Sequence, residues 1–370
     1  MDDFDVIVVG ARVAGAATAM LLARRRLRVL VLDRGRYGTD TLSTHALMRG
    51  GVHLLSRWGL LDRIIAAGTP PVTQTRFHYD TDVTVSIKPS PGVRALYAPR
   101  RTLLDRVIVD AAMEAGADIR FGVSVSGLLN DDGRVIGVYG RDRDGHEVTA
   151  RARLVVGADG IRSTVAHQAG AAELRRGCGA GAVVYGYWSQ LPTCGYEWFY
   201  RPGFTAGFIP TNGDQICVFA GCPASELVRT DLHGTYHRML AAATRGHEER
   251  LTSARPPQRL HTWVGRTGFV RRAHGPGWVL IGDAAYFLDP LSTHGITDAL
   301  RDAELLSAAV TAQDFDTAVE DFARRRGEVV DALFGAVDEI AGYQWDPPRI
   351  RRLLLDLNSA MGAEMALLTG

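Results

Sequence analysis

The sequence is poor in lysine and has no excess of charge of one sign. Lys88 is the only lysine among 42 basic residues, and 41 acidic residues leave a net charge of +1. A protein whose main task is to bind nucleic acid carries a basic patch or stripe. The balance therefore argues against nucleic acid as a partner.

Cysteine is scarce and long apolar runs are missing. The four cysteines, at 178, 194, 217 and 222, have neither CxxC nor metal-ligand spacing, so we expect free thiols, no disulfide and no structural metal. No apolar run is long enough to cross a bilayer, and the acidic start differs from the basic start of a signal peptide. We therefore expect a cytoplasmic chain without membrane insertion.

The chain has the length and the core-forming residues of a large α/β protein. Its 370 residues are 46% hydrophobic and 22% charged, which suits one large domain or two lobes. The apolar run 5–9 is typical of a buried parallel strand, the turn 10–15 contains two glycines, and a helix is expected over about 16–25. A second strand over 28–32 ends at Asp33.

This order of elements is that of a dinucleotide-binding unit. In such a unit the pyrophosphate of the ligand lies on the helix N-terminus, and an acidic residue about 20 positions later binds ribose hydroxyls. Asp33 has this spacing from the turn. Arg12 replaces the middle glycine of G-x-G-x-x-G. It either adds positive charge near the phosphates or points into the neighbouring cleft, and an ordinary strand-turn-helix is the alternative.

Two further motifs follow in the chain. The run 155–163 (VVGADGIRS) predicts a buried strand with a polar turn into a helix. The run 277–285 (GWVLIGDAA) predicts another buried strand with Gly-Asp at a helix start, and 289–299 (DPLSTHGITDA) is the loop before the next helix.

The three motifs together resemble the FAD-dependent class A flavoprotein monooxygenases, the para-hydroxybenzoate hydroxylase-like superfamily, from residue 5 to about 310. The resemblance implies an α/β fold: a Rossmann-like FAD-binding domain with an inserted β-sheet substrate domain and C-terminal helices. The FAD-binding domain is expected over 1–72, 98–180 and 271–345, the substrate-binding sheet over 73–97 and 181–270, and a C-terminal helix over 346–370.

The resemblance also assigns residues to the cofactor. Asp33 would bind the adenosine ribose, Arg101 would reach the FAD with Arg100 as a competitor, and Asp283 would hold the ribityl chain and pyrophosphate. The full expected set is Gly10, Arg12, Ala14, Gly15, Asp33, Arg34, Arg101, Val125, Asp159, Gly160, Gly282, Asp283, Pro290, Gly295 and Ile296. A serine and a threonine replace a glycine and the asparagine of the family's P-x-G-x-G-x-N loop.

The sequence Ser-Thr-His occurs twice, at 43–45 and 292–294. Candidate catalytic groups are His45, His294 and the backbone of Gly295, and either histidine is equally well a loop cap. His78 is a third candidate for a general base. A helix N-terminus at Gly295 would stabilise negative charge on a reduced flavin.

Aromatic residues gather in strands with period-two alternation over 183–187, 198–200, 204–209 and 216–220, with shorter strands over 75–79 and 83–87. They predict a sheet over the flavin and a bulky, apolar or aromatic substrate, or else simple packing. The expected substrate residues are Tyr185, Tyr187, Trp198, Tyr200 and Phe208. Charged residues within 301–355 are expected on the solvated faces of amphipathic helices.

By this resemblance the leading function is an NAD(P)H-dependent monooxygenase that uses O2 through a flavin C4a-hydroperoxide. No second dinucleotide motif is present, so NADPH or NADH would bind transiently. The alanine-, arginine- and glycine-rich composition suits an actinobacterial source and a natural-product tailoring step. The alternatives are a prenyl-reductase-like enzyme acting on a carbon–carbon double bond and a non-redox FAD-holding cyclase or scaffold. A halogenase is disfavoured because G-W-x-W-x-I-P is absent and Lys88 is the only lysine.

Overall fold

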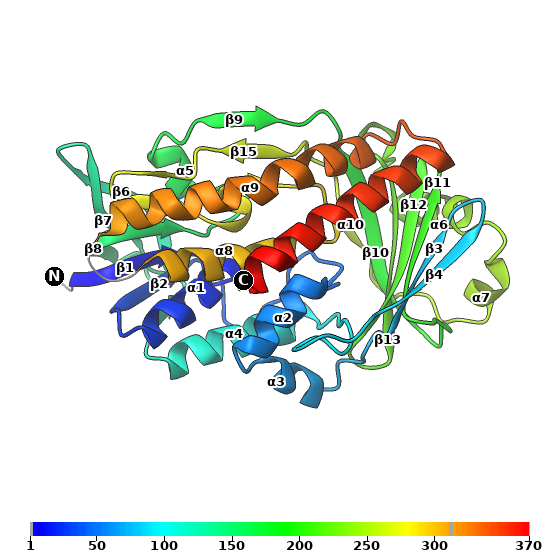
Figure 1. Cartoon of the computed structure of the whole chain (residues 1–370), viewed down its shortest axis with the longest axis horizontal. Helices are drawn as coiled ribbons and strands as arrows, with labels where there is room; N and C mark the ends of the chain where they lie inside the picture. Colours follow the sequence, from blue (N-terminus) through cyan, green and yellow to red (C-terminus); the bar gives the residue numbers. More distant parts are fainter. Residues whose placement is uncertain (1–2, 311–313, 370) are drawn as a thin grey trace.

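The computed structural model describes residues 3–310 and 314–369 of the chain. A mainly parallel sheet with helices fills one end of the elongated molecule, and a mainly antiparallel sheet fills the other (Figure 1). The α/β fold class expected from the sequence is confirmed.

The first sheet has eight strands around a parallel centre, in the order β16-β17-β8-β1-β2-β5, with β7 paired to β8 and β6 to β7. Its strands are β1 (Asp3–Val9), β2 (Val29–Asp33), β5 (Asp118–Phe121), β6 (Ser124–Asp131), β7 (Arg134–Arg141), β8 (Glu147–Gly157), β16 (His274–Gly275) and β17 (Trp278–Leu280). The central strands are apolar on both faces because elements cover both sides, as parallel sheets require.

The second sheet has seven strands in the order β14-β10-β13-β12-β11-β3-β4, all antiparallel neighbours except β11 and β3. They are β3 (Gln74–His78), β4 (Asp82–Ser86), β10 (Gly181–Ser189), β11 (Tyr196–Arg201), β12 (Phe204–Thr211), β13 (Gln215–Pro223) and β14 (His261–Trp263). One face packs on the main core and the opposite, outer face packs on α6 (Leu232–Ala243). The strands expected at 75–79, 83–87 and 183–220 are present, and the domain boundaries stay a prediction.

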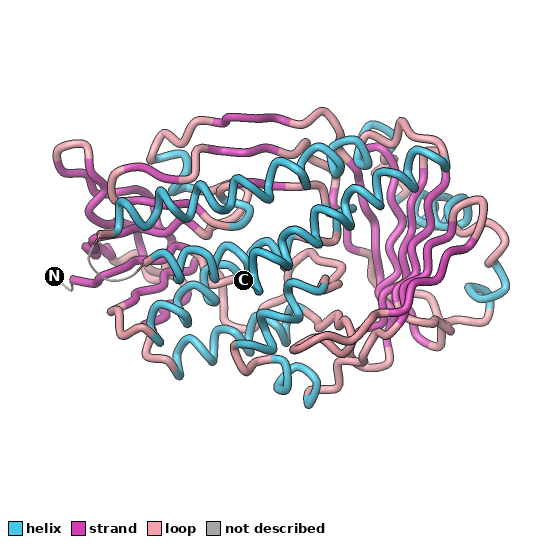
Figure 2. Tube along the Cα trace, viewed as in Figure 1, coloured by secondary structure: helices cyan, strands magenta, loops and turns pink. Residues whose placement is uncertain are grey.

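A three-stranded sheet connects the two ends, and helices fill the space between them (Figure 2). Its strands are β9 (Glu173–Arg176), β15 (Phe269–Arg271) and β18 (Tyr286–Phe287). The other helices are α1 (Val13–Arg24), α2 (Arg49–Arg57), α3 (Leu61–Ala66), α4 (Arg101–Glu114), α5 (Thr164–Gln168), α7 (Glu248–Thr252), α8 (Gly295–Ala309), α9 (Phe315–Ala341), α10 (Pro347–Thr369), and the short 3₁₀ turns η1 (Ala224–Glu226), η2 (Gly282–Ala284) and η3 (Pro290–Ser292).

The two long helices α9 and α10 run side by side along the molecule and join its two ends (Figures 1 and 2). They are amphipathic, as expected, but three charged residues within 301–355 are buried where solvated ones were expected: Arg301 and Asp302 on α8 and Arg326 on α9. Arg326 was expected on a solvated face, but its side chain is buried because it lies 3.7 Å from the buried carboxylate of Asp302 and over the Tyr286 ring.

A second correction concerns the run 277–285. A helix start was expected at Gly-Asp, but Gly282–Ala284 form only a 3₁₀ turn. The chain then enters the short strand β18, because its residues pair with β15. The helix begins later, at Gly295.

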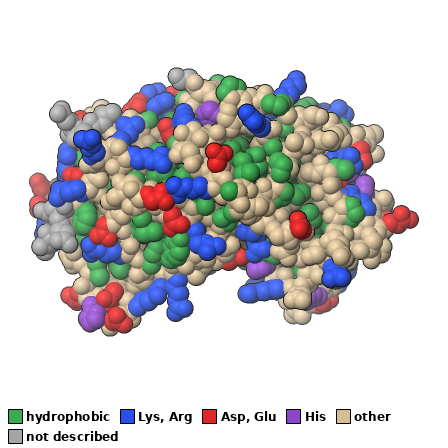
Figure 3. All heavy atoms as spheres, turned by 90° about the horizontal axis from the view of Figure 1, so that it is seen from below, with side chains coloured by type: hydrophobic (Ala, Val, Ile, Leu, Met, Phe, Trp, Pro, Cys, Tyr) green, Lys and Arg blue, Asp and Glu red, His purple; other side chains and the backbone are tan. Residues whose placement is uncertain are grey.

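The surface mixes charges of both signs, in keeping with the net charge of +1. Figure 3 shows basic and acidic side chains interspersed with apolar ones on one face. No helix within the described residues is long and apolar enough to cross a membrane. The four cysteines are free thiols, of which Cys217 and Cys222 are buried.

Candidate functional site

The turn between β1 and α1 has glycines at two positions where no side chain fits. Gly10 has a φ of +104°, and a Cβ there would lie 2.5 Å from the carbonyl oxygen of Ala158. A Cβ on Gly15 would lie 1.8 Å from the carbonyl oxygen of Gly10. Only glycine fits either position, so strand, turn and helix α1 can approach closely.

The N-terminus of α1 is left open to an anion. Its N-cap residue, Arg12, makes no side-chain capping bond within the described chain, and the first helical turn has no acidic residue. The free N–H groups and the helix dipole favour a phosphate there. At the end of β2, Asp33 accepts hydrogen bonds from the N–H groups of Ala11 (2.7 Å) and Gly35 (2.5 Å), which orients its carboxylate beside the turn.

Two arginines at this end share one carboxylate. Arg12 Nη1 donates to Asp105 Oδ2 at 2.8 Å, and Arg101 Nε donates to Asp105 Oδ1 at 2.8 Å. Both arginines line the cavity described next. Arg100, the competitor of Arg101, instead pairs with Asp40 and covers the ring of Tyr187.

A cavity of about 730 Å³ begins at this turn and extends to the loop before α8. The predicted cofactor residues that line it are Gly10, Arg12, Ala14, Asp33, Arg34, Arg101, Val125, Asp159, Gly160, Asp283, Pro290, Gly295 and Ile296. Gly15 and Gly282 lie behind its wall. Gly15 allows the close contact with Gly10, and the Gly282 N–H donates to the buried Asp302 carboxylate at 2.9 Å.

Asp159 and Asp283 stand at two sides of the cavity with different partners. Asp159 accepts hydrogen bonds from the Ser163 hydroxyl (2.5 Å) and the Thr164 N–H (2.6 Å), so it shapes the turn into α5. Asp283 opens onto the cavity, and its side chain is exposed to that space. Loss of hydration among the surrounding protein atoms, followed by the negative charge of Asp298, raises the pKa of Asp283 to about 7.

The loop before α8 presents His294 and the N-terminus of the helix. His294 is the N-cap of α8, follows Thr293 in the left-handed region (φ +52°), and is buried in the cavity wall. Its Nε2 lies 2.7 Å from Glu364 Oε2, while its Nδ1 has no hydrogen-bond partner among the described residues. Burial alone lowers the pKa of His294, but the Glu364 and Asp298 carboxylates outweigh it and raise that pKa.

Beneath this loop lies a buried ion network that the sequence reasoning missed. Arg301 is fully buried and donates to Asp298 (2.6 Å), Glu364 (2.8 Å) and Asp302 (2.9 Å). The i, i+3 spacing of Asp298 and Arg301 on one helix was a signal that these two charges pair. Glu364 comes from α10, and no local sequence pattern predicts that it lies beside Arg301.

His45, the other predicted histidine, lies in the opposite part of the cavity wall. It has a φ of +69° and a nearly fully buried side chain. Its Nε2 lies 2.5 Å from the Tyr187 hydroxyl, and its Nδ1 has no partner within the described chain. Burial, followed by the positive charges of Arg100 and Arg101, lowers the pKa of His45 well below 6.5, so the imidazole is neutral at pH 7.

The predicted aromatic residues separate into three positions. None of the five predicted substrate residues lines the cavity. Tyr185 and Tyr187 lie behind the loop 43–45 of its wall, since the Tyr185 hydroxyl accepts the Ser43 N–H at 3.1 Å and the Tyr187 hydroxyl contacts His45. Trp198 and Tyr200 are buried in the main core, on the same face of the sheet but outside the cavity lining. Phe208 is buried on the outer face, under α6.

Other residues line the cavity in their place. Trp263 and Phe287 are aromatic cavity residues that the sequence reasoning did not select, because they lie outside the strongly alternating strands. His78, the third candidate base, does not line the cavity. Its ring stacks on Phe199 on the outer face of the sheet, 4.2 Å between ring centroids.

The residues present fit an FAD cofactor. The glycine turn and the open N-terminus of α1 suit a diphosphate, Asp33 suits ribose hydroxyls, and Asp283 opens onto the cavity with a carboxylate that a hydroxyl of the ligand can satisfy. Near α8, the helix N-terminus and the raised pKa of His294 suit a ring that becomes negatively charged.

Comparison with known proteins agrees with this site. The family model described as "FAD binding domain" matches residues 3–322. Digeranylgeranylglycerophospholipid reductase 2 of Methanopyrus kandleri is 28% identical over 322 residues, which are 80% of this chain and 74% of the reductase. Protein FixC of Escherichia coli is 28% identical over 232 residues, and the match spans 61% of this chain and about half (51%) of FixC.

Two solved structures share the fold. The myxobacterial chondrochloren halogenase CndH superposes with a TM-score of 0.80 at 23% identity, covering 90% of this chain and 82% of its own. Pseudomonas aeruginosa PqsL in complex with 2-aminobenzoylacetate superposes with a TM-score of 0.81 at 20% identity, covering 95% and 100%. The chain therefore belongs to the FAD binding domain family and is an FAD-dependent oxidoreductase.

Proposed function

We propose that this protein is an NAD(P)H-dependent monooxygenase that hydroxylates or epoxidises a bulky, apolar or aromatic small molecule with O2. The turn at Gly10, Asp33 and Asp283 would hold FAD, with the start of α8 beside the ring. FAD, when bound and reduced, supplies the activation of O2 and the transfer of one oxygen atom to the substrate. The protein supplies binding, orientation, exclusion of water and the handling of protons.

The observation that carries this proposal is the hydrogen bond between His45, which lines the cavity, and Tyr187, which lies behind it. A neutral imidazole has one unprotonated nitrogen. When Nε2–H donates a hydrogen bond to the Tyr187 oxygen, Nδ1 keeps its lone pair and has no partner among the described residues. This nitrogen is buried in the wall, so in our proposal the bound substrate displaces the loop 43–45 and brings its hydroxyl to Nδ1, which accepts the proton. Loss of that proton makes a phenolic ring richer in electrons, which favours attack on an electrophilic oxygen. His45 thus acts as the base that prepares an aromatic substrate.

The same pair is poorly suited to donate a proton. Burial lowers the pKa of His45 well below 6.5 and raises the pKa of Tyr187 far above 10, so the imidazole is unprotonated at pH 7 and the phenol is a very weak acid. Reduction of a carbon–carbon double bond needs a proton donor beside the hydride donor. These pKa directions therefore favour oxygenation.

A second candidate is such a reductase, favoured by the 28% identity with the Methanopyrus kandleri enzyme over most of both chains. Halogenation is not proposed, because Lys88 does not line the cavity, whose lining holds no lysine. Its backbone carbonyl accepts from Arg49 in the β3–β4 region.

Two measurements test the proposal. The visible spectrum of purified protein is recorded before and after NADPH is added without oxygen, and the flavin band is expected to bleach. With ¹⁸O₂ and a panel of phenols and polyenes, the product is expected to gain one ¹⁸O atom. A product that gains two hydrogens without ¹⁸O establishes the reductase, and a band that never bleaches, with either nicotinamide and with substrates, overturns both.

The base role has its own test. The rate at saturating substrate is expected to fall as pH drops through the lowered pKa of His45, because protonation removes the acceptor nitrogen. His45→Gln is expected to lose this acid limb and about 10²-fold or more in kcat while keeping FAD. Tyr187→Phe is the matched control, since it keeps the imidazole and removes its partner. An unchanged pH profile in His45→Gln contradicts the assignment.

A further inference from the structure

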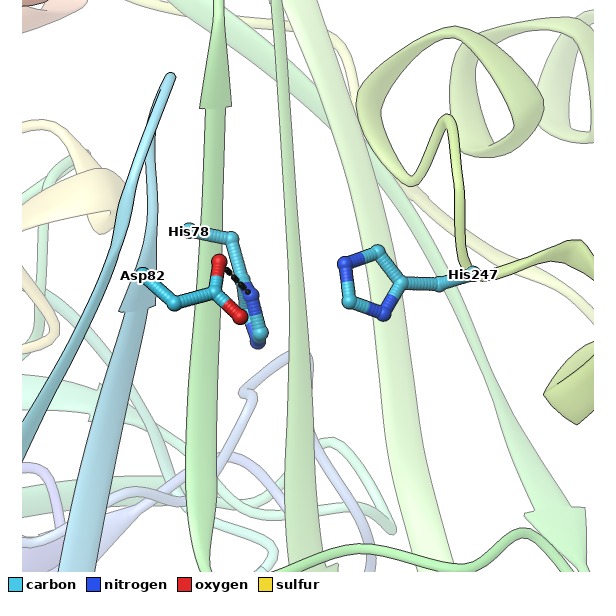
Figure 4. Close-up of side chains that lie close together, drawn as sticks. All are labelled: His78, Asp82 and His247. Carbon is cyan, nitrogen blue, oxygen red and sulfur yellow. Dashed lines mark hydrogen bonds and ion pairs between the residues drawn. The ribbon is translucent and has the colours of Figure 1, made fainter.

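A second group of titratable side chains lies outside the cavity, on the outer face of the seven-stranded sheet. His78, at the end of β3, and Asp82, at the start of β4, come from one hairpin, and His247 comes from the segment just before α7 (Figure 4). One ligand atom from each lies within 4.8 Å of the other two. The three residues meet between two segments that are 165 positions apart in the chain.

His78 is held in the orientation of a metal ligand. Its side chain is fully buried, and its Nε2 lies 3.1 Å from Glu197 Oε2. Glu197 is itself fixed by two bonds from Arg250, at 2.7 and 2.9 Å. A carboxylate that accepts a hydrogen bond from Nε2–H leaves Nδ1 with a free lone pair, which is the usual arrangement behind a metal-bound histidine.

The other side of the ring faces a second carboxylate. His78 Nδ1 lies 2.8 Å from Asp82 Oδ1, so two electron-pair donors face one another across this contact, with either a proton or a shared cation between them (Figure 4). Ligand atoms of a four-coordinate zinc ion are about 3.3 Å apart when the metal–ligand bonds are about 2.0 Å. A small outward shift of the half-exposed Asp82 side chain meets that spacing.

His247 completes the set. Its ring lies edge-on to His78, with 4.6 Å between ring centroids, and neither ring nitrogen has a hydrogen-bond partner within the described residues. An imidazole nitrogen without a hydrogen-bond partner keeps a lone pair that can ligate a metal ion. The side chain is partly exposed, which leaves a path for an ion to enter.

We propose that His78, Asp82 and His247 bind one divalent transition-metal ion of the zinc class. Two imidazoles and a carboxylate suit such an ion, and the position left open on the solvent side suits water. The bound ion joins the β3–β4 hairpin to the connection between α6 and α7. Its role is structural, because the site is on the sheet face opposite the cavity.

The test uses the untagged, full-length holoprotein, freed of metal with a chelator. Zn²⁺ is titrated by calorimetry and Co²⁺ by visible absorption, and one equivalent is expected to bind with release of protons. His247→Ala and, separately, Asp82→Ala are expected to weaken binding by at least about tenfold. Zn²⁺ is expected to raise the melting temperature of the parent protein and not that of His247→Ala.

His146→Ala is the matched control. His146 belongs to another group of possible ligands, with Asp142 and Asp144, on an exposed loop. Binding of one equivalent that survives His146→Ala and is lost in both site variants supports the proposal. Absence of saturable binding, binding that persists in either site variant, or binding lost in His146→Ala overturns it. FAD absorbance and circular dichroism, measured without metal, verify that each variant is folded, and neither depends on the reaction of the flavin.

Discussion

Two buried histidines in different parts of the molecule share almost the same immediate surroundings. In each case Nε2 contacts a buried carboxylate, and an arginine pairs with that carboxylate. The two sets are His294, Glu364 and Arg301, here called the cavity triad, and His78, Glu197 and Arg250, called the outer triad. What differs is the surroundings of the second ring nitrogen.

In the cavity triad that nitrogen has no partner among the described residues, and His294 lines the cavity. In the outer triad it lies 2.8 Å from Asp82. A histidine fixed through one nitrogen is thus free to serve an anionic ligand or a cation with the other. The comparison teaches that the role of a buried histidine depends on what surrounds its second ring nitrogen, the one that the carboxylate does not hold.

The arginines differ as well. Arg301 is fully buried and pairs with Asp298, Asp302 and Glu364, so these carboxylates already have a cationic partner. Arg250 is about a quarter exposed and lies on the far side of Glu197 from the proposed ion. Water can therefore reach the charge of Arg250 when its partner is lost, but not that of Arg301.

The largest effect is expected on stability. Glu364→Ala leaves Arg301 and His294 without their shared carboxylate and is expected to cost about 3–5 kcal/mol of unfolding free energy. Glu197→Ala is expected to cost less, about 1–3 kcal/mol, because Arg250 can turn to water. Denaturant unfolding at pH 7 measures both. Equal losses contradict the distinction, and Glu364→Gln, which keeps the size of the side chain, separates lost charge from lost packing.

The next effect is expected on cofactor binding. Asp283→Ala removes the carboxylate in the cavity and is expected to weaken FAD binding about a hundredfold, or about 2.7 kcal/mol. Because the raised pKa of Asp283 shows that the fold does not favour its charge, the FAD-free variant is expected to stay folded. Titration with FAD, followed by flavin fluorescence, measures the change. Asp82→Ala, beside the outer triad, should leave FAD binding unchanged. Equal losses of FAD affinity in the two variants refute the separation of the two sites.

The loss of unfolding free energy at acidic pH gives a third comparison between the two triads. Burial opposes ionisation of Glu364 and Glu197, but the neighbouring histidine and arginine outweigh it and lower each pKa to about 2. The stabilisation is complete above the ordinary pKa near 4.5 and is lost as pH falls toward 2. Each site is expected to contribute roughly 1–3 kcal/mol to this loss.

Unfolding free energy measured between pH 6 and pH 2.5 tests the assignment. Glu364→Gln and Glu197→Gln should each flatten the curve, because glutamine does not titrate. His294 adds an opposite limb in the parent protein: its raised pKa stabilises below pH 6.5 and ceases to do so as pH rises through that pKa. Curves that keep the full slope in both variants assign the acid limb to other carboxylates.

The parts predicted from sequence are those encoded locally. The turn at Gly10, the acidic end at Asp33 and the loop before Gly295 each lie within a few residues of a buried strand or a helix start, so pattern and spacing locate them. The outcome agrees with the fold expected for the family. The helix start at Gly282 was wrong, because pairing with β15 keeps the chain extended, and so was the solvated position of Arg326.

The parts not predicted depend on contacts between distant residues. Glu364 meets His294 across 70 positions, and no local pattern signals such a pair. Period-two alternation predicts that Trp198 and Phe208 lie in strands, but it does not say which face of the sheet meets the ligand. The face is decided by α6, which covers Phe208 from the outer side.

The smallest effect is expected at Arg12, where this chain departs from the glycine motif. Its guanidinium is already engaged by Asp105 and by the carbonyl of Thr39, and its side chain is 38% exposed. Arg12→Gly is therefore expected to cost at most about 1 kcal/mol of stability and to change FAD affinity less than about threefold. Asp105 keeps Arg101 as a partner. Fluorescence titration with FAD decides the matter: a loss comparable to that of Asp283→Ala means that the arginine turns to the pyrophosphate when FAD binds, which would make it part of the cofactor site.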